Sequence, residues 1–189
     1  MERVSSAARC ETFRSILNAG PSTSAFDRAN AMTDDSPKRP PIFLLPGEGK
    51  KIENGRGGST TYKAIGADTG SLFGMFESVQ PPHSRGPELH YHRRMTEMFW
   101  VVEGLIHIEA GGQSIEAPPG SFALVPPGTL HRFNNPLDTP SKMLIMFSPG
   151  DQREFYFEGM AEFSRRETPP SREEVLELMH RFDQYIPGE

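Results

Sequence analysis

Glycine and proline divide the middle of the chain into short segments. Between residues 42 and 147 they break apolar or alternating runs at roughly ten-residue intervals, a spacing typical of a β-sandwich or β-barrel. The candidate strands are 42–45, 60–66, 72–79, 89–92, 97–102, 105–109, 113–116, 122–125, 131–134 and 142–147. One hairpin is clear, because Gly111 and Gly112 can adopt the positive φ angles of a tight turn. The pattern predicts an all-β fold, closed or built from two sheets.

The two flanking segments have different patterns. Ser, Ala, Arg, Asn and Pro dominate residues 1–40, which predicts a poorly ordered N-terminal arm. An alternative is that part of this arm pairs with the edge of a partner subunit's sheet. We therefore expect an arm at 1–40, a barrel at 41–150 and a helical extension at 151–189 that packs on the barrel.

The C-terminal extension shows the periodicity of two amphipathic helices. Asp151 is the expected N-cap of the first helix, and Ser171 that of the second. The expected apolar faces comprise Tyr156, Met160 and Phe163 in the first helix, and Val175, Met179, Phe182 and Ile186 in the second.

The overall composition excludes several classes of protein. The 189 residues carry a formal net charge of −5 and no basic stripe, so we expect no nucleic-acid partner. The longest apolar runs are far shorter than the roughly 20 residues of a membrane helix. No secretory signal is apparent, so we expect no membrane association and a cytoplasmic location. Cys10 is the single cysteine, which excludes an intrachain disulfide and a thiolate cluster.

The octapeptide HYHRRMTE, residues 90–97, is the strongest sign of chemistry. Side chains alternate along a strand, so His90 and His92 share one face. A bend after His92 can return the chain so that Glu97 begins the next strand facing them. This segment therefore supplies three potential metal ligands.

A fourth potential ligand lies in the segment GSFALVPPGTLHRFNN, residues 120–135. Its Pro-Pro-Gly turn delivers His131 to the start of a strand. Three imidazoles and one carboxylate suit one divalent first-row transition metal. Iron, manganese, nickel, cobalt, copper and zinc all accept such ligands, so the donor set leaves the metal open. Four protein ligands of a six-coordinate metal would leave two positions for a small-molecule substrate, or for substrate and dioxygen together.

The two segments together resemble the two motifs of the cupin superfamily. The first motif is matched by His90, His92, Glu97 and Gly104. The second is matched by Gly120, Pro126, Gly128, His131 and Asn135. One departure is Ser84, which stands where the family usually has a glycine. The resemblance implies a double-stranded β-helix jelly roll, the cupin barrel, with the C-terminal helices outside it and with His90, His92, Glu97 and His131 binding the metal inside it.

Within the superfamily, the chain looks like the single-domain, quercetin-dioxygenase-like group. This resemblance implies a dioxygenase that acts on a small enolic or aromatic substrate, flavonol- or polyketide-like, with Glu97 as the catalytic base. Two alternatives stay open: a non-oxidative cyclase or isomerase of polyketide-like substrates that uses the same metal, and a cupin that binds a small molecule without catalysis.

Alternation along two strands identifies further candidates. Phe99 and Val101 share the face of Glu97, and Phe133 shares that of His131, so these three are the expected substrate-binding wall. Met98, Trp100 and Val102 point the other way. A large apolar outer face needs cover, which predicts a homodimer.

Overall fold

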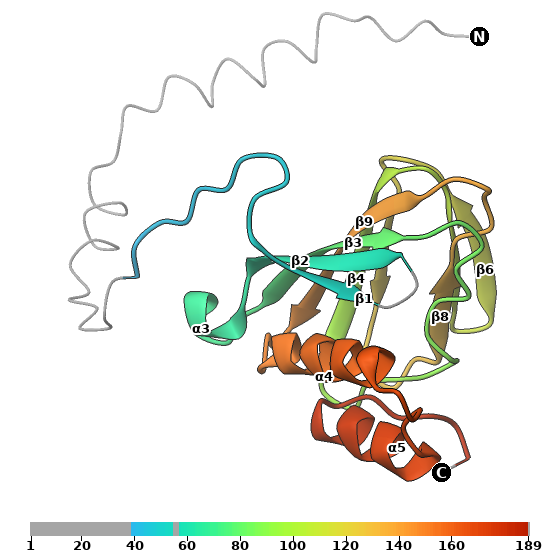
Figure 1. The fold of residues 1–189 in the computed structure, drawn as a ribbon. Coiled ribbons are helices and arrows are strands. Elements are labelled where there is room, and N and C mark those ends of the chain that lie inside the picture. Colours follow the sequence, from blue (N-terminus) through green and yellow to red (C-terminus); the bar gives the residue numbers. More distant parts are fainter. Residues whose placement is uncertain (1–38, 55–56, 189) are drawn as a thin grey trace, which may run out of the picture. The chain divides into compact units, whose positions relative to one another are not determined.

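The computed structural model describes residues 39–54 and 57–188, and within them it shows the expected jelly roll (Figure 1). A six-stranded antiparallel sheet has the order β1-β2-β3-β9-β4-β7, and a three-stranded antiparallel sheet has the order β6-β5-β8. The strands are β1 (Lys50–Asn54), β2 (Gly58–Ala64), β3 (Gly74–Gln80), β4 (Thr96–Glu103), β5 (Ile106–Ala110), β6 (Gln113–Ala117), β7 (Phe122–Val125), β8 (His131–Asn134) and β9 (Ser141–Ser148). The arm predicted at 1–40 lies outside the described residues except for its last two.

The expected hairpin and most of the expected strands are present. β7 and β8 have the predicted bounds, and Gly111 and Gly112 join β5 to β6 with φ angles of 57° and 78°. The prediction of a strand at 42–45 was wrong. Phe43 is 87% exposed there, and the prolines on both sides of the segment cannot donate to a strand ladder.

Two other segments also differ from the expectation. β1 was missed because its sequence, KKIEN, is charged; it is an exposed edge strand that pairs only with β2, so its side chains need no apolar alternation. The segment expected as a strand at 89–92 forms two isolated bridges instead. In these bridges His90 pairs with His131, and Tyr91 pairs with Tyr185.

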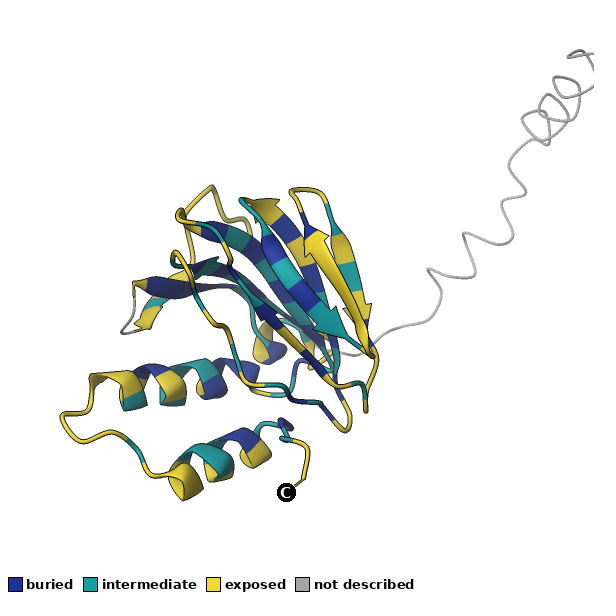
Figure 2. Ribbon diagram, turned by 90° about the vertical axis from the view of Figure 1, so that its right-hand side faces the viewer, coloured by how far each residue is buried: buried dark blue, intermediate teal, exposed yellow. Residues whose placement is uncertain are grey.

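The core lies between the two sheets. Buried and partly exposed residues alternate along β3 and β9, as period-two side-chain geometry requires, and Figure 2 shows this alternation across the sheet. The largest fully buried side chains include Phe76, Phe99 and Phe147. The rings of Phe76 and Phe147 meet edge to face with centroids 6.0 Å apart. Aromatic burial of this kind dominates the apolar contribution to stability in a small barrel.

Among the described residues, three helices accompany the strands: α3 (Gly66–Thr69), α4 (Arg153–Arg165) and α5 (Arg172–Arg181). α4 lies against the outer strand β1, and Tyr62 Oη donates a hydrogen bond of 3.0 Å to the carbonyl of Glu154. None of the helices in the described part of the chain is long and apolar enough to cross a membrane.

Of the two predicted N-caps, that of α5 is confirmed and that of α4 was wrong. Ser171 is the N-cap of α5, where its hydroxyl accepts from the Glu174 amide in a capping box. Asp151 does not cap α4; the N-cap is Gln152, in a left-handed conformation with φ of 52°. The expected face of α4 was right in part: Tyr156 is 8% exposed, but Met160 is 36% exposed and Arg153, which was not expected there, is 2% exposed.

Asn135 holds the loop after β8 in place. Its amide donates to the carbonyls of Pro81 and Thr139 at 2.9 and 2.8 Å, and its Oδ1 accepts from the Leu137 amide and the Ser141 hydroxyl at 3.0 Å each. The side chain is 1% exposed.

We expect Asn135→Ala to lower the free energy of unfolding by about 3 kcal/mol, because it leaves several buried groups without partners. Urea unfolding in the presence of a chelator measures this change without a contribution from bound metal. Asn134→Ala is the matched control: Asn134 is less buried and bonds the side chain of His107. Equal losses in the two variants would contradict the assignment of a special role to Asn135.

Candidate metal centre

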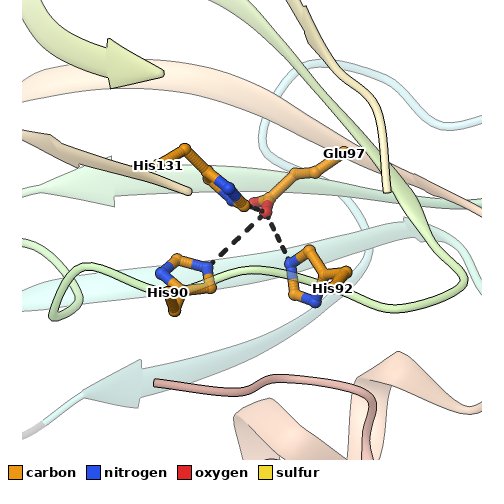
Figure 3. Close-up of side chains that lie close together, drawn as sticks. All are labelled: His90, His92, Glu97 and His131. Atoms are coloured by element: carbon orange, nitrogen blue, oxygen red, sulfur yellow. Dashed lines mark hydrogen bonds and ion pairs between the residues drawn. The ribbon is translucent and has the colours of Figure 1, made fainter. Parts of the chain in front are cut away.

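The structure brings together the four residues identified as potential ligands. His90, His92, Glu97 and His131 are all buried, and one ligand atom from each lies within 4.8 Å of the others. Figure 3 shows the histidines converging on Glu97. The Nε2 atoms of His131, His92 and His90 lie 2.7, 2.8 and 3.8 Å from Oε2 of Glu97. The four side chains therefore surround one point inside the barrel.

Backbone pairing brings the two halves of the site together. The His90 amide donates to the His131 carbonyl at 3.0 Å, and the His131 amide donates back at 2.8 Å. The amide of Gly128, in the Pro-Pro-Gly turn, donates to the His92 carbonyl at 2.7 Å. Glu97 lies in β4 between β7 and β9, opposite Val125 and Phe147. Glu97 and His131 are thus placed by strands β4 and β8, and His90 and His92 by backbone hydrogen bonds to the segment 128–131.

Each imidazole is oriented by a backbone carbonyl at its other nitrogen. The Nδ1 atoms of His90, His92 and His131 lie 2.8, 2.6 and 2.9 Å from the carbonyl oxygens of Glu88, Asp183 and Thr129. A carbonyl only accepts hydrogen bonds, so each Nδ1 carries a proton. In the neutral ring the Nε2 lone pair then faces the centre, which is the tautomer a metal needs.

The electrostatics of the group favour a cation. Burial alone would raise the pKa of Glu97, but the hydrogen bonds from His131 and His92, with His90 Nε2 3.8 Å away, hold that pKa well below its usual range. Burial opposes a charge on His131, yet its hydrogen bond to Glu97 raises the pKa of the imidazole. Burial lowers the pKa of His90. The ionised carboxylate is thus compensated by histidine protons, in the place where a divalent cation would bind.

The donor set fits a metal. Nitrogen and carboxylate donors match divalent first-row transition metals, and the described residues near the site add no thiolate. Such an ion would carry a net charge of about +1 after the carboxylate is counted. His90, His92, Glu97 and His131 would hold it, and this chemistry leaves its identity open.

The three residues expected as the pocket wall lie on the ligand face of the barrel. Phe99 and Val101 are fully buried and Phe133 is 6% exposed. The ring of Phe99 lies 6.3 Å from that of His131 and 5.4 Å from that of Phe133. All three belong to the hydrophobic core cluster. Their contact with substrate stays a prediction.

Two residues near the centre were missed by sequence reasoning. Asp183 accepts the hydrogen bond of His92, and the Arg153 guanidinium lies 4.5 Å from the ring centroid of Phe147, which in turn packs against His92. Both residues come from the C-terminal helical segment. An aspartate just past a helix and an arginine in its first turn are common on protein surfaces, so the local sequence held no signal for either.

Comparisons with known proteins agree with this geometry. Residues 76–147 match the family described as Cupin domain. The chain is 31% identical over 113 residues to quercetin 2,3-dioxygenase from Bacillus subtilis, an alignment that covers 58% of this chain and 32% of that protein. The chain thus spans about a third of the length of this curated relative.

Two solved structures share the fold. The structure of KdgF from Halomonas sp. matches with a TM-score of 0.54 and 20% identity, over 61% of this chain and 99% of that one. An RmlC-like cupin from Shewanella frigidimarina matches with a TM-score of 0.52 and 20% identity, over 61% of this chain and 96% of that one. At this identity the two structures bear on the fold alone.

We expect Glu97→Ala and His131→Ala to lower the metal content of the purified protein at least about tenfold, because each removes one of four donors. Elemental mass spectrometry of proteins reconstituted in parallel measures the content, and circular dichroism checks folding. Glu109→Ala is the control, since Glu109 is a surface carboxylate that pairs with Arg132 beside the site. Wild-type metal content in Glu97→Ala would show that the ion binds elsewhere.

Proposed function

We propose that this chain, in which residues 76–147 match the Cupin domain family, is a metal-dependent dioxygenase of a small enolic or aromatic molecule. One observation carries this proposal: three Nε2 atoms and one carboxylate converge in a buried site, and each Nδ1 is bonded to a backbone carbonyl, so that Nε2 is the nitrogen left to bind an ion. The likeness to a quercetin 2,3-dioxygenase supports the choice of reaction. The substrate class is flavonol- or polyketide-like.

A divalent transition metal in this site would supply Lewis acidity towards a deprotonated substrate oxygen and electron exchange with dioxygen. The protein residues would supply proton transfer and an apolar environment that excludes water. Glu97 is ionised, so it can accept the proton of a substrate hydroxyl. The histidine hydrogen bonds weaken it as a base, and coordination to a divalent cation, which would replace these bonds, would also keep the pKa of the carboxylate low; Glu97 would therefore accept a proton from a hydroxyl whose own pKa the same ion lowers.

The apolar side chains around the centre favour a planar, conjugated substrate. Phe99, Val101 and Phe133 line the ligand side of the sheets, and the two rings meet with an interplanar angle of 63°. Aromatic walls bind flat rings and exclude water from a reactive intermediate. We therefore propose these three residues as the substrate-binding wall.

We expect the reconstituted protein to consume dioxygen together with an enolic or flavonol-like substrate, and His131→Ala to reduce this rate at least about 100-fold because the centre loses a ligand. An oxygen electrode with parallel chromatography of the substrate measures both reactants. Phe99→Leu should raise KM with a smaller effect on kcat, because it alters the wall without removing a metal ligand.

The same assay separates the alternatives. Substrate turnover that continues without oxygen would replace the proposal by a cyclase or isomerase. A protein that binds metal and consumes no substrate under any tested condition would be a binding protein.

We further propose that the protein is a homodimer. On the outer face of the larger sheet, Trp100, Phe122 and Leu124 are 45%, 50% and 54% exposed. Trp100 pairs with Phe122 across β4 and β7, and Met98 pairs with Leu124, so these side chains form one apolar surface. A second copy of the chain would bury it.

We expect Trp100→Ser to shift the protein from dimer to monomer, because it removes the largest side chain of this apolar surface. Sedimentation equilibrium at micromolar concentration measures the mass. Leu45→Ser is the control, since Leu45 is 70% exposed and lies in the segment before β1. A monomeric wild type, or an equal response of both variants, would contradict the proposed interface.

A further inference from the structure

The turn that follows α5 is joined to the segment that carries three of the four candidate ligands. The Tyr91 amide donates to the Tyr185 carbonyl, and the Tyr185 amide donates back, both at 2.9 Å. The two tyrosine rings lie 5.6 Å apart, and the Arg93 guanidinium lies 3.8 Å from the ring centroid of Tyr185. These contacts fix residues 183–185 beside residues 91–95, about 90 positions apart in the sequence.

The Asp183 carboxylate bonds to the bend between His92 and Glu97. Its Oδ1 accepts from the Arg93 amide at 3.1 Å, and its Oδ2 accepts from the amides of Arg94 and Met95 at 2.9 and 3.0 Å. Three successive backbone amides of the bend between His92 and Glu97 therefore meet one carboxylate. The side chain is buried, with an exposed fraction of 4%. A carboxylate that accepts several amide hydrogen bonds restrains the backbone that donates them.

The backbone of Asp183 touches a ligand directly. Its carbonyl accepts from Nδ1 of His92 at 2.6 Å. The corresponding acceptors for His90 and His131 are the carbonyls of Glu88 and Thr129, each only two residues away. His92 is thus the one candidate ligand whose ring orientation depends on a remote segment of the chain.

Arg153 holds this turn from the other side. It is 2% exposed, and its guanidinium donates to the Phe182 carbonyl at 2.9 Å and to the side chain of Gln184. The guanidinium also lies over the rings of Phe147 and Tyr156. Asp183 itself has a left-handed φ of 58°, a conformation that the surrounding contacts maintain.

From these contacts we propose that Asp183 is a positioning residue of the metal centre, so that the turn after α5 forms part of that centre. The carboxylate fixes the bend that connects His92 to Glu97, and the carbonyl fixes the tautomer and ring direction of His92. This inference rests on the proposed metal-dependent function. Asp183 touches neither metal nor substrate, so its effect is exerted through His92 and the bend.

Two substitutions separate the carboxylate from the backbone conformation. Asp183→Gly removes the carboxylate and adopts a positive φ without strain. Asp183→Asn keeps the shape and tolerates the left-handed conformation, but it replaces one acceptor oxygen by a donor. Ser171→Ala is the matched control, because it removes the N-cap of α5 and leaves the contacts of Asp183 intact.

The measurement is a titration of each metal-free protein with Co²⁺, followed by visible absorption, with circular dichroism as the check of folding. We expect Asp183→Gly to bind Co²⁺ about tenfold more weakly than the wild type, the usual effect of losing an outer support of a metal ligand. The spectrum of its bound Co²⁺ should also change, because the direction of His92 is less restrained. Asp183→Asn should show a smaller loss. Ser171→Ala should lower the melting temperature with no change in Co²⁺ affinity or spectrum.

Each contrary outcome has a distinct meaning. Wild-type affinity and spectrum in Asp183→Gly would overturn the positioning role while the metal site stands. Equal weakening by Ser171→Ala and Asp183→Gly would also overturn it, because stability of α5 alone would then explain the loss. A wild type that binds neither Co²⁺ nor any other tested divalent ion would overturn the proposed function, and this inference with it.

Discussion

The constraint on which the rest of the structure depends is the burial of an ionised carboxylate. Glu97 is 2% exposed. An isolated carboxylate in such a place destabilises the fold by several kcal/mol unless charges and hydrogen bonds compensate it. The compensation comes from three imidazoles, and each of these is in turn tied to a backbone carbonyl. Removal of any one partner leaves the others poorly satisfied, so the four side chains act as a unit.

The group formed by Glu97 and the three histidines also requires two distant parts of the chain, residues 90–97 and His131, to meet inside the barrel. Local alternation places His90 and His92 on one face, and a bend of a few residues brings Glu97 opposite them. His131 arrives from another part of the chain through the two backbone hydrogen bonds with His90. That bridge joins the segment of His90, which lies outside the named strands, to the start of β8, and it holds the two histidines side by side.

The sequence allowed the fold class, most strands and the four candidate ligands to be predicted, because these depend on short-range patterns. The turn at Gly111 and Gly112 and the alternation in β7 and β8 are local properties. β1 and the segment 42–45 were misjudged for a common reason. Apolarity predicts strands that are buried on one face, whereas a largely exposed edge strand such as KKIEN, in which only Ile52 packs on the core, depends mainly on backbone pairing.

The contacts around the centre could not be predicted, because they join residues that are distant in sequence and belong to types usually found on surfaces. Arg153 is buried only because the Phe182 carbonyl, the Gln184 side chain and two aromatic rings surround its guanidinium. Asp183 is buried because three amides of the ligand bend donate to it. A hydropathy scale assigns each residue type one fixed value. An arginine or an aspartate that is buried by its partners therefore looks the same in the pattern as one on the surface.

The dependence of His92 on a remote carbonyl has a thermodynamic consequence. If ordering of the C-terminal turn orients one metal ligand, then a bound metal must stabilise the docked turn by the same free energy by which the docked turn strengthens metal binding. His90 and His131 take their acceptors from within two residues, so their orientation contributes little to this coupling. The coupling would therefore pass through His92 and through the bend that leads to Glu97. On this proposal, the C-terminal segment and the candidate metal centre form one cooperative element rather than a core with an added cover.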